Sequence, residues 1–192
     1  MRLAGVLVVL FVLALTFLAA CGDGGGEPAP TSTAPAPSPS PVETPFEGGR
    51  EPVEKEVPSP QVAYLANVRT EEQELFDRVI FEFEGGSTGY RFQYVEPPII
   101  EDPSGLPVEV GGNAFLQVVF FSASGVDLSE ATPRITCCAT EPQTGLTALV
   151  DLRKTGDFEA TLSWVLGLDA EVDFQVTELS DPYRIVIDVG HP

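Results

Sequence analysis

The chain alternates apolar and polar residues with a period of two over most of its length. The pattern starts after Val62 and is clearest in segments 79–83, 90–94, 158–166, 172–176 and 185–189. Successive side chains of an extended chain point to opposite faces, so this period predicts half-buried β-strands. Only residues 71–76 leave room for a single helical turn.

Segment 115–121 differs, because apolar residues occupy both of its alternating faces. A strand of this kind is expected to be buried on both sides, in the middle of a sheet. Short strands separated by Gly, Pro and Asp turns, about ten residues apart, are typical of all-β domains. The pattern predicts an antiparallel β-sandwich of two packed sheets, with a closed barrel as the alternative. We expect Trp164 and most other aromatic residues to lie in its core.

The N-terminal segment contains an uninterrupted apolar run, residues 3–20, after a single basic residue. It ends in Leu18-Ala19-Ala20-Cys21, which matches the cleavage site of bacterial lipoprotein signal peptides. Residues 1–20 are therefore predicted to be a signal peptide, and Cys21 the lipidated residue. The alternative is an uncleaved membrane span, because the run is just long enough to cross a bilayer. Residues 22–26 argue against a span, since they lack a basic flank. We expect the protein on the extracytoplasmic face of the cell membrane, anchored by lipid.

Residues 21–60 contain mainly Gly, Pro, Ala, Ser, Thr and Glu, with few bulky apolar side chains. Such a composition cannot bury enough surface to fold, so this segment is predicted to be a disordered linker. Its prolines favour extended conformations, which suit a spacer between a membrane and a domain. The folded domain is expected to span residues 61–192.

The sequence carries 29 acidic and 10 basic residues, a formal net charge of −19. A strongly negative surface repels the phosphates of nucleic acids and anionic lipid headgroups. We therefore expect no nucleic-acid partner.

One short motif, Gly85-Gly86-Ser87-Thr88-Gly89, fits the G-x-S-x-G pattern of serine hydrolases. That motif requires a helix after the serine, whereas a second strand is expected here. The only histidine, His191, lies next to the C-terminus, where we do not expect it to be held as a general base. The segment is better interpreted as a hairpin turn with glycines at positive φ. We expect a protein that is not an enzyme.

The three cysteines also limit the chemistry of the chain. Apart from Cys21, the chain contains only Cys137 and Cys138, which are adjacent in sequence. A zinc site needs three or four converging ligands, which two neighbouring cysteines and one histidine do not supply. No metal site and no cofactor are predicted. We expect one buried and one surface thiol, with a disulfide between these neighbours, or a metal-binding or redox role, as alternatives.

A six-residue pattern occurs twice, as Arg78-Val79-Ile80-Phe81-Glu82-Phe83 and as Arg184-Ile185-Val186-Ile187-Asp188-Val189. Each copy begins with Arg and has a carboxylate in fifth place, on the same strand face. The two copies could occupy related places in the two sheets.

The segments DRVIFEFEG, GYRFQYVEPP, VEVGGNAFLQVVF, DFEATLSWVLGL and DPYRIVIDVGH, in this order, resemble the AMIN-like domain of actinobacterial lipoproteins. The resemblance covers residues 61–192, and the parent AMIN domain is a β-sandwich that directs proteins to peptidoglycan. It implies a non-catalytic module that binds peptidoglycan or another cell-envelope component.

The resemblance also points to particular side chains, because the Arg-x-x-x-acid strands take part in wall binding in the parent family. The implied binding residues are Arg78, Glu82, Arg184 and Asp188, since Arg can bind a carboxylate bidentately. The alternative is that these residues pair with each other across the sheet. An adaptor that binds another envelope protein, without wall affinity, is the alternative function.

Overall fold

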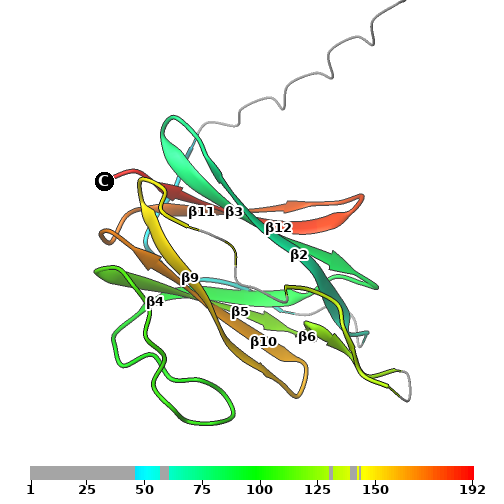
Figure 1. Ribbon diagram of the computed structural model, residues 1–192. Helices are drawn as coiled ribbons and strands as arrows, with labels where there is room; N and C mark the ends of the chain where they lie inside the picture. Colours follow the sequence, from blue (N-terminus) through cyan, green and yellow to red (C-terminus); the bar gives the residue numbers. More distant parts are fainter. Residues whose placement is uncertain (1–45, 57–60, 130–131, 139–141, 143) are drawn as a thin grey trace, which may run out of the picture. The chain divides into compact units, whose positions relative to one another are not determined.

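Two five-stranded β-sheets pack face to face in the computed structural model (Figure 1). The structure describes residues 46–56, 61–129, 132–138, 142 and 144–192. All of them belong to one compact unit, and none of them lies in a helix. The prediction of an all-β sandwich of two packed, mainly antiparallel sheets is confirmed.

The first sheet has the strand order β1-β4-β5-β10-β9. Its strands are β1 (Val53–Lys55), β4 (Gly89–Val95), β5 (Ala114–Phe121), β10 (Thr161–Leu168) and β9 (Leu149–Phe158). The second sheet has the order β11-β12-β3-β2-β6. Its strands are β11 (Phe174–Leu179), β12 (Tyr183–Gly190), β3 (Phe76–Glu84), β2 (Ala63–Glu72) and β6 (Ala123–Ser124). A small ribbon pairs β7 (Val126–Asp127) with β8 (Arg134–Ile135).

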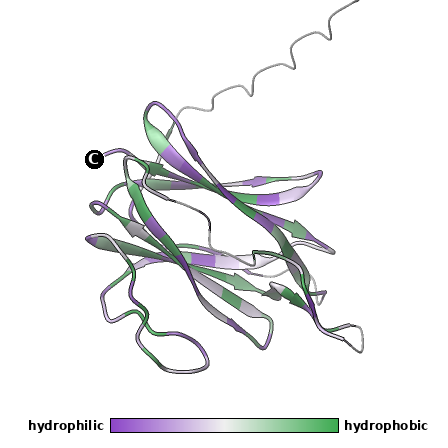
Figure 2. Ribbon diagram, in the orientation of Figure 1, coloured by the Kyte–Doolittle hydropathy of each residue, from purple (hydrophilic) through white to green (hydrophobic). Residues whose placement is uncertain are grey.

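The core lies between the facing sheets and is rich in aromatic rings. Phe81 of β3 packs edge-on against Phe120 of β5 and Trp164 of β10, with ring centroids 4.9 and 5.7 Å away. All three side chains are almost fully buried, as expected for Trp164 and for most of the aromatic residues. Figure 2 shows hydrophobic and hydrophilic residues interspersed along the strands of both sheets, as the period of two predicted.

Strand β5 lies in the middle of the first sheet, between β4 and β10, as segment 115–121 predicted. Its inward side chains Leu116, Val118 and Phe120 are fully buried. On the outward face Phe115 and Gln117 are only half-buried. The position was predicted correctly, whereas burial on both sides is incomplete.

Segment 158–166 was predicted as one strand, and this is wrong. Strand β9 ends at Phe158 and β10 begins at Thr161. Glu159 and Ala160 form the turn of a hairpin, with φ of 50° and 57°. Two successive residues at positive φ reverse the chain tightly, with the twist that antiparallel strands need. The alternation misled the prediction because it continues across the turn.

Residues 71–76 contain no helical turn. Strand β2 runs on to Glu72 and β3 begins at Phe76, so the segment is a tight reversal closed by a 2.9 Å hydrogen bond from Gln73 N to Phe76 O.

The segment at Gly85 to Gly89 was predicted to be a hairpin turn, which is also wrong. It carries the chain from β3 in the second sheet to β4 in the first. Gly85 does adopt a positive φ, of 81°.

The predicted linker is too long at its C-terminal end, because residues 46–56 are part of the sandwich. Strand β1 pairs with β4, Gly49 bridges to Phe174 of β11, and Phe46 stacks on Phe76 at 5.7 Å. These contacts are all with residues distant in sequence, so local composition could not reveal them.

The predicted signal peptide and Cys21 lie outside the described residues. In the part of the chain that is described, no helix is long and apolar enough to span a membrane.

Candidate functional site

The two copies of the Arg-x-x-x-acid pattern are neighbours in one sheet. Strands β3 and β12 pair antiparallel, with Arg78 opposite Asp188 and Glu82 opposite Arg184. The pattern complements itself in this arrangement, because each Arg of one copy faces the acid of the other. The expectation that the copies occupy related places in two sheets is therefore wrong.

All four side chains lie on the outer face of the second sheet. Arg78 and Glu82 are four residues apart on β3, as are Arg184 and Asp188 on β12, and an even spacing keeps side chains on one face. The intervening residues Val79 and Phe81 point into the core and are fully buried. The structure thus gathers the four residues that the sequence pattern singled out.

Arg78 and Asp188 form a tight ion pair. Arg78 donates from Nε and Nη2 to the two carboxylate oxygens, at 2.7 and 2.9 Å. The Asp188 side chain is only 8% exposed, and Arg78 also lies over the Phe76 ring, 5.2 Å from its centroid. The hydrogen bond to Asp188 raises the pKa of Arg78. Cross-strand pairing, the alternative to ligand binding, is what the structure shows for these two residues.

Arg184 and Glu82 face each other in the register but do not form the matching pair. Glu82 accepts instead from Nη1 of Arg69 on β2, at 3.4 Å. Arg184 donates from Nε to the carbonyl of Pro182 at 3.2 Å. Among the described residues, no carboxylate forms an ion pair with Arg184. Its guanidinium is the charged group on this face that remains available to a ligand.

Arg69 also belongs to this face and was missed at the sequence level. It lies between Glu71 and Glu82, at 3.5 and 3.4 Å, on the strand next to β3. No repeat marks Arg69, and only the sheet order brings it beside the motif strands. Three of the ten basic residues of the chain, Arg69, Arg78 and Arg184, are thus concentrated on one outer face. We call this surface the arginine face.

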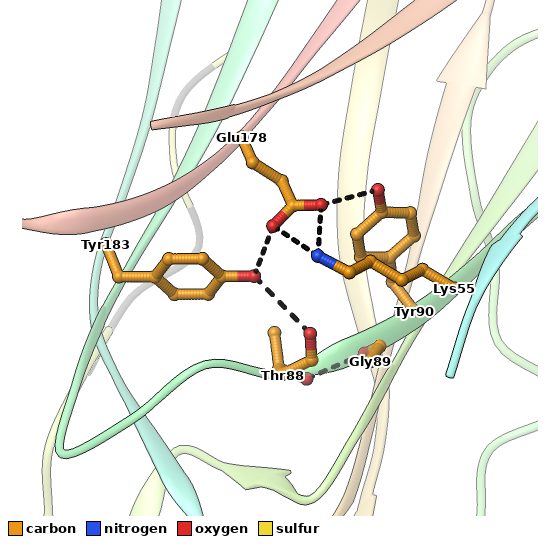
Figure 3. A network of polar contacts seen from close by, with 6 residues as sticks. All are labelled: Lys55, Thr88, Gly89, Tyr90, Glu178 and Tyr183. Atoms are coloured by element: carbon orange, nitrogen blue, oxygen red, sulfur yellow. Dashed lines mark hydrogen bonds and ion pairs between the residues drawn. The ribbon is translucent and has the colours of Figure 1, made fainter. Parts of the chain in front are cut away.

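A second polar cluster ties the two sheets together at the edge where β1 and β11 lie (Figure 3). Lys55 of β1 donates to both oxygens of Glu178 on β11, each at 2.7 Å. Tyr90 and Tyr183 donate to the same carboxylate at 3.0 and 3.2 Å. This cluster links strands of both sheets, and all of its groups are satisfied by one another.

The cluster shifts the ionisation of its members. Burial and the hydrogen bond to Glu178 raise the pKa of Tyr90 to about 12. Burial and the charge of Glu178 likewise raise the pKa of Tyr183. Burial works against the charged form of Glu178, but the hydrogen bonds from Lys55, Tyr90 and Tyr183 outweigh it and lower the pKa of that carboxyl.

His191 is held in place, against expectation. Its Nε2 lies 3.0 Å from Oδ1 of Asp77, which is fully buried at the start of β3. The other oxygen of Asp77 accepts from the backbone N–H groups of Ala148 and Leu149, at 2.6 and 2.9 Å. The pair fastens the C-terminal end of the chain to the loop before β9. Its partners are more than seventy residues apart in sequence, so no local signal predicted it.

Cys137 and Cys138 are joined in a disulfide. The expectation of one buried and one surface thiol is wrong, and the alternative of a bond between neighbours is what the structure shows. Both residues are half-buried and pack against the edge of the core.

The comparisons with known proteins find a match to a family model. The family model of the AMIN-like domain matches residues 63–191, which include β2 to β12 and both motif strands. No curated protein and no solved structure is significantly similar to the chain. Residues 46–56, with strand β1, precede the matched region. Because the match covers well over half of the sequence, the chain belongs to the AMIN-like domain family.

Proposed function

We propose that the protein is a non-catalytic binding module of the cell envelope and that its ligand is a peptidoglycan component. In this proposal a lipid on Cys21 anchors it to the extracytoplasmic face of the cell membrane. The membership in the AMIN-like family supports an envelope-related binding role. The cleavage-site pattern before Cys21 supports the anchor.

The observation that carries the proposal is the environment of Arg184 on the arginine face. The neighbouring Arg78 is saturated by Asp188, and Arg69 is shared between two glutamates. Arg184 is half-buried and pairs with no carboxylate among the described residues, so it can donate to an incoming one. Guanidinium groups bind carboxylates in a bidentate fork, and the peptide stems of peptidoglycan carry carboxylates.

The arrangement also addresses the acidity of the chain. A net charge of −19 repels an anionic ligand at long range, and this repulsion is screened at physiological salt. A bidentate contact acts at short range and is screened less when partly buried. We therefore expect binding that tolerates physiological salt.

Co-sedimentation with purified peptidoglycan tests the proposal. The test protein is residues 46–192, because the described residues from 46 onward form one unit with its own core. We expect it to pellet with the wall at low and at physiological salt. We expect Arg184→Ala to remove most of the pelleting.

The matched control is Arg153→Ala, which deletes the same charge from β9 in the other sheet. It should pellet like the unmodified protein. Equal pelleting of the Arg184→Ala variant would contradict the assignment of the site. Failure to pellet at either salt would overturn wall binding and favour an adaptor that binds another envelope protein.

A further inference from the structure

A cavity of about 470 Å³ opens between the two sheets, on the side away from the Glu178 cluster. This volume lies within the range of small-molecule sites, roughly 300–1,000 Å³. The residues that line the cavity come from both sheets and from the loops that cover this side. Among the described residues they are Leu65, Glu101, Gly125, Cys137, Cys138, Lys154 and Trp164.

The walls of the cavity are fixed by hydrogen bonds to the sheets. Asp102, next to Glu101, donates from its backbone N–H to Thr155 O on β9 at 2.8 Å. Thr136, next to Cys137, donates from its hydroxyl to Leu65 O at 2.8 Å and from its N–H to Gly125 O at 2.9 Å. The loops therefore hold Glu101 and the disulfide at the cavity without requiring a ligand. A preformed site loses little conformational freedom when a ligand binds.

Trp164 contributes an unsatisfied donor to this region. The residue is 1% exposed, and its indole Nε1 has no hydrogen-bond partner among the described residues. A buried N–H without an acceptor is energetically unfavourable, because it has lost its hydrogen bonds to water. Such a group is uncommon in folded proteins, and one beside a cavity indicates a missing acceptor.

The lining narrows the chemistry of a ligand. Among the described residues of the lining, Glu101 and Lys154 carry one negative and one positive charge, so these residues together favour neither an anion nor a cation. Glu101 accepts hydrogen bonds, Lys154 and Trp164 donate them, and Leu65 with the disulfide gives apolar surface. A sugar matches this set, because its hydroxyls both donate and accept while its C–H groups pack on apolar side chains.

We propose that this cavity is a second binding site, separate from the arginine face, for an uncharged carbohydrate. In the bound state a ligand oxygen accepts the Trp164 N–H, and a ligand hydroxyl donates to Glu101. The proposal does not depend on wall binding through Arg184, which lies on the outer face of the second sheet.

Tryptophan fluorescence tests the proposal directly, because Trp164 is the only tryptophan of the chain. Residues 46–192 are titrated with N-acetylglucosamine, a neutral probe that carries hydroxyls and an amide. We expect a saturable change in emission in the millimolar range. Sodium acetate and ethylammonium chloride, as charged probes, should produce no saturable change.

The variant Glu101→Gln removes a carboxylate from an exposed loop and should weaken binding of the probe at least tenfold. Glu109→Gln makes the same change in the same loop, but away from the cavity lining, and should bind like the unmodified protein. Arg184→Ala should also retain binding. No saturable change up to about 50 mM probe, well above a millimolar dissociation constant, would overturn the proposal. An unchanged affinity in Glu101→Gln would overturn it equally.

Discussion

Arg78 and Arg184 occupy equivalent places in two copies of one sequence pattern, yet their environments differ. Arg78 is held by the buried Asp188, whereas the carboxylate opposite Arg184 is taken by Arg69. The sequence indicated the four residues and their common face. It did not distinguish the structural pair from the available guanidinium, because that difference depends on Arg69 in a third strand. Candidate residues were thus predictable, whereas their individual roles were not.

The two arginines are therefore expected to respond differently to substitution. Removal of a partner from a fully buried pair costs about 3–5 kcal/mol, and exposed pairs contribute about 0–1 kcal/mol. The side chains of Arg78 and Asp188 are 30% and 8% exposed, so Arg78→Ala should lower the free energy of unfolding by about 2 kcal/mol. Arg184→Ala should change it by less than about 0.5 kcal/mol. Denaturant unfolding checks both values, and equal losses would show that the two residues play the same structural part.

The tyrosines give a prediction in alkaline solution. The pKa of Tyr90 is about 12, and the pKa values of Tyr64, Tyr94 and Tyr183 are also raised. The chain has four tyrosines, so in the folded protein each should ionise above the ordinary pKa of about 10, and Tyr90 only near pH 12. Absorbance of the phenolate should therefore rise at higher pH in the folded protein than in urea, where the transition should lie at about pH 10. Coincident transitions in the folded and the unfolded protein would contradict the burial of these rings.

The raised pKa of Tyr90 also makes the free energy of unfolding depend on pH. Between pH 10 and 12 the folded state retains a proton on Tyr90 that the unfolded state has lost, so the free energy of unfolding falls as pH rises.

At acidic pH the lowered pKa of Glu178 has a similar effect. It stabilises the folded state above the ordinary pKa of a glutamate, and this stabilisation is lost as the pH falls through the pKa that Glu178 has in the folded protein. Glu178→Gln should reduce the dependence of stability on acidic pH, as followed by urea unfolding at a series of pH values.

At the scale of elements, the period of two predicted most of the strands and the sandwich. The central place of β5 also followed from its composition, since it is apolar on both faces. Prediction failed where a strand depends on pairing with residues distant in sequence. It also failed where a strand ends although the alternation of apolar and polar residues continues. Strand β1 has three residues and depends on β4 and Glu178, and the turn at Glu159 and Ala160 continues the alternation of β9 and β10. Strand order and the crossing at Gly85 are likewise long-range properties.

Strand β1 is expected to matter for stability, although it lies before the family match. A fragment that begins at residue 61 loses β1 and the Lys55 contacts, which leaves Glu178 without its charged partner. Loss of a partly buried charged hydrogen bond should lower the free energy of unfolding by about 2 kcal/mol relative to residues 46–192. Lys55→Met in the longer fragment isolates the charge contribution. Equal stability of the two fragments would show that β1 is dispensable.

The loop before β5 packs so closely on β10 that one glycine is indispensable. A Cβ at Gly167 would collide with the carbonyl oxygen of Gly111, so the loop must move. Gly167→Ala should lower the free energy of unfolding by about 3 kcal/mol, the upper end of overpacking effects. Gly49→Ala is the matched control, because nothing lies within 4 Å of its added Cβ. Thermal unfolding of both variants checks the prediction, and a neutral Gly167→Ala would refute this close contact.

At the scale of the whole molecule, three polar features occupy separate places on one sandwich. The arginine face covers the outside of the second sheet, and the Glu178 cluster closes one edge between the sheets. The cavity beside Trp164 opens on the other side. The cluster is internally satisfied and is structural, whereas the other two have a donor left over, Arg184 in one and Trp164 in the other. Binding is therefore expected at these two places, through different chemistry.

The central claim is that the arginine face binds a carboxylate of the wall, and NMR mapping tests it most directly. Isotope-labelled residues 46–192 are titrated with soluble muropeptides, and the amide shifts are followed. We predict that the largest changes occur at Arg184 and its neighbours on β3 and β12, and that Arg184→Ala abolishes them. Changes confined to the first sheet, or no changes at all, would contradict binding at the arginine face.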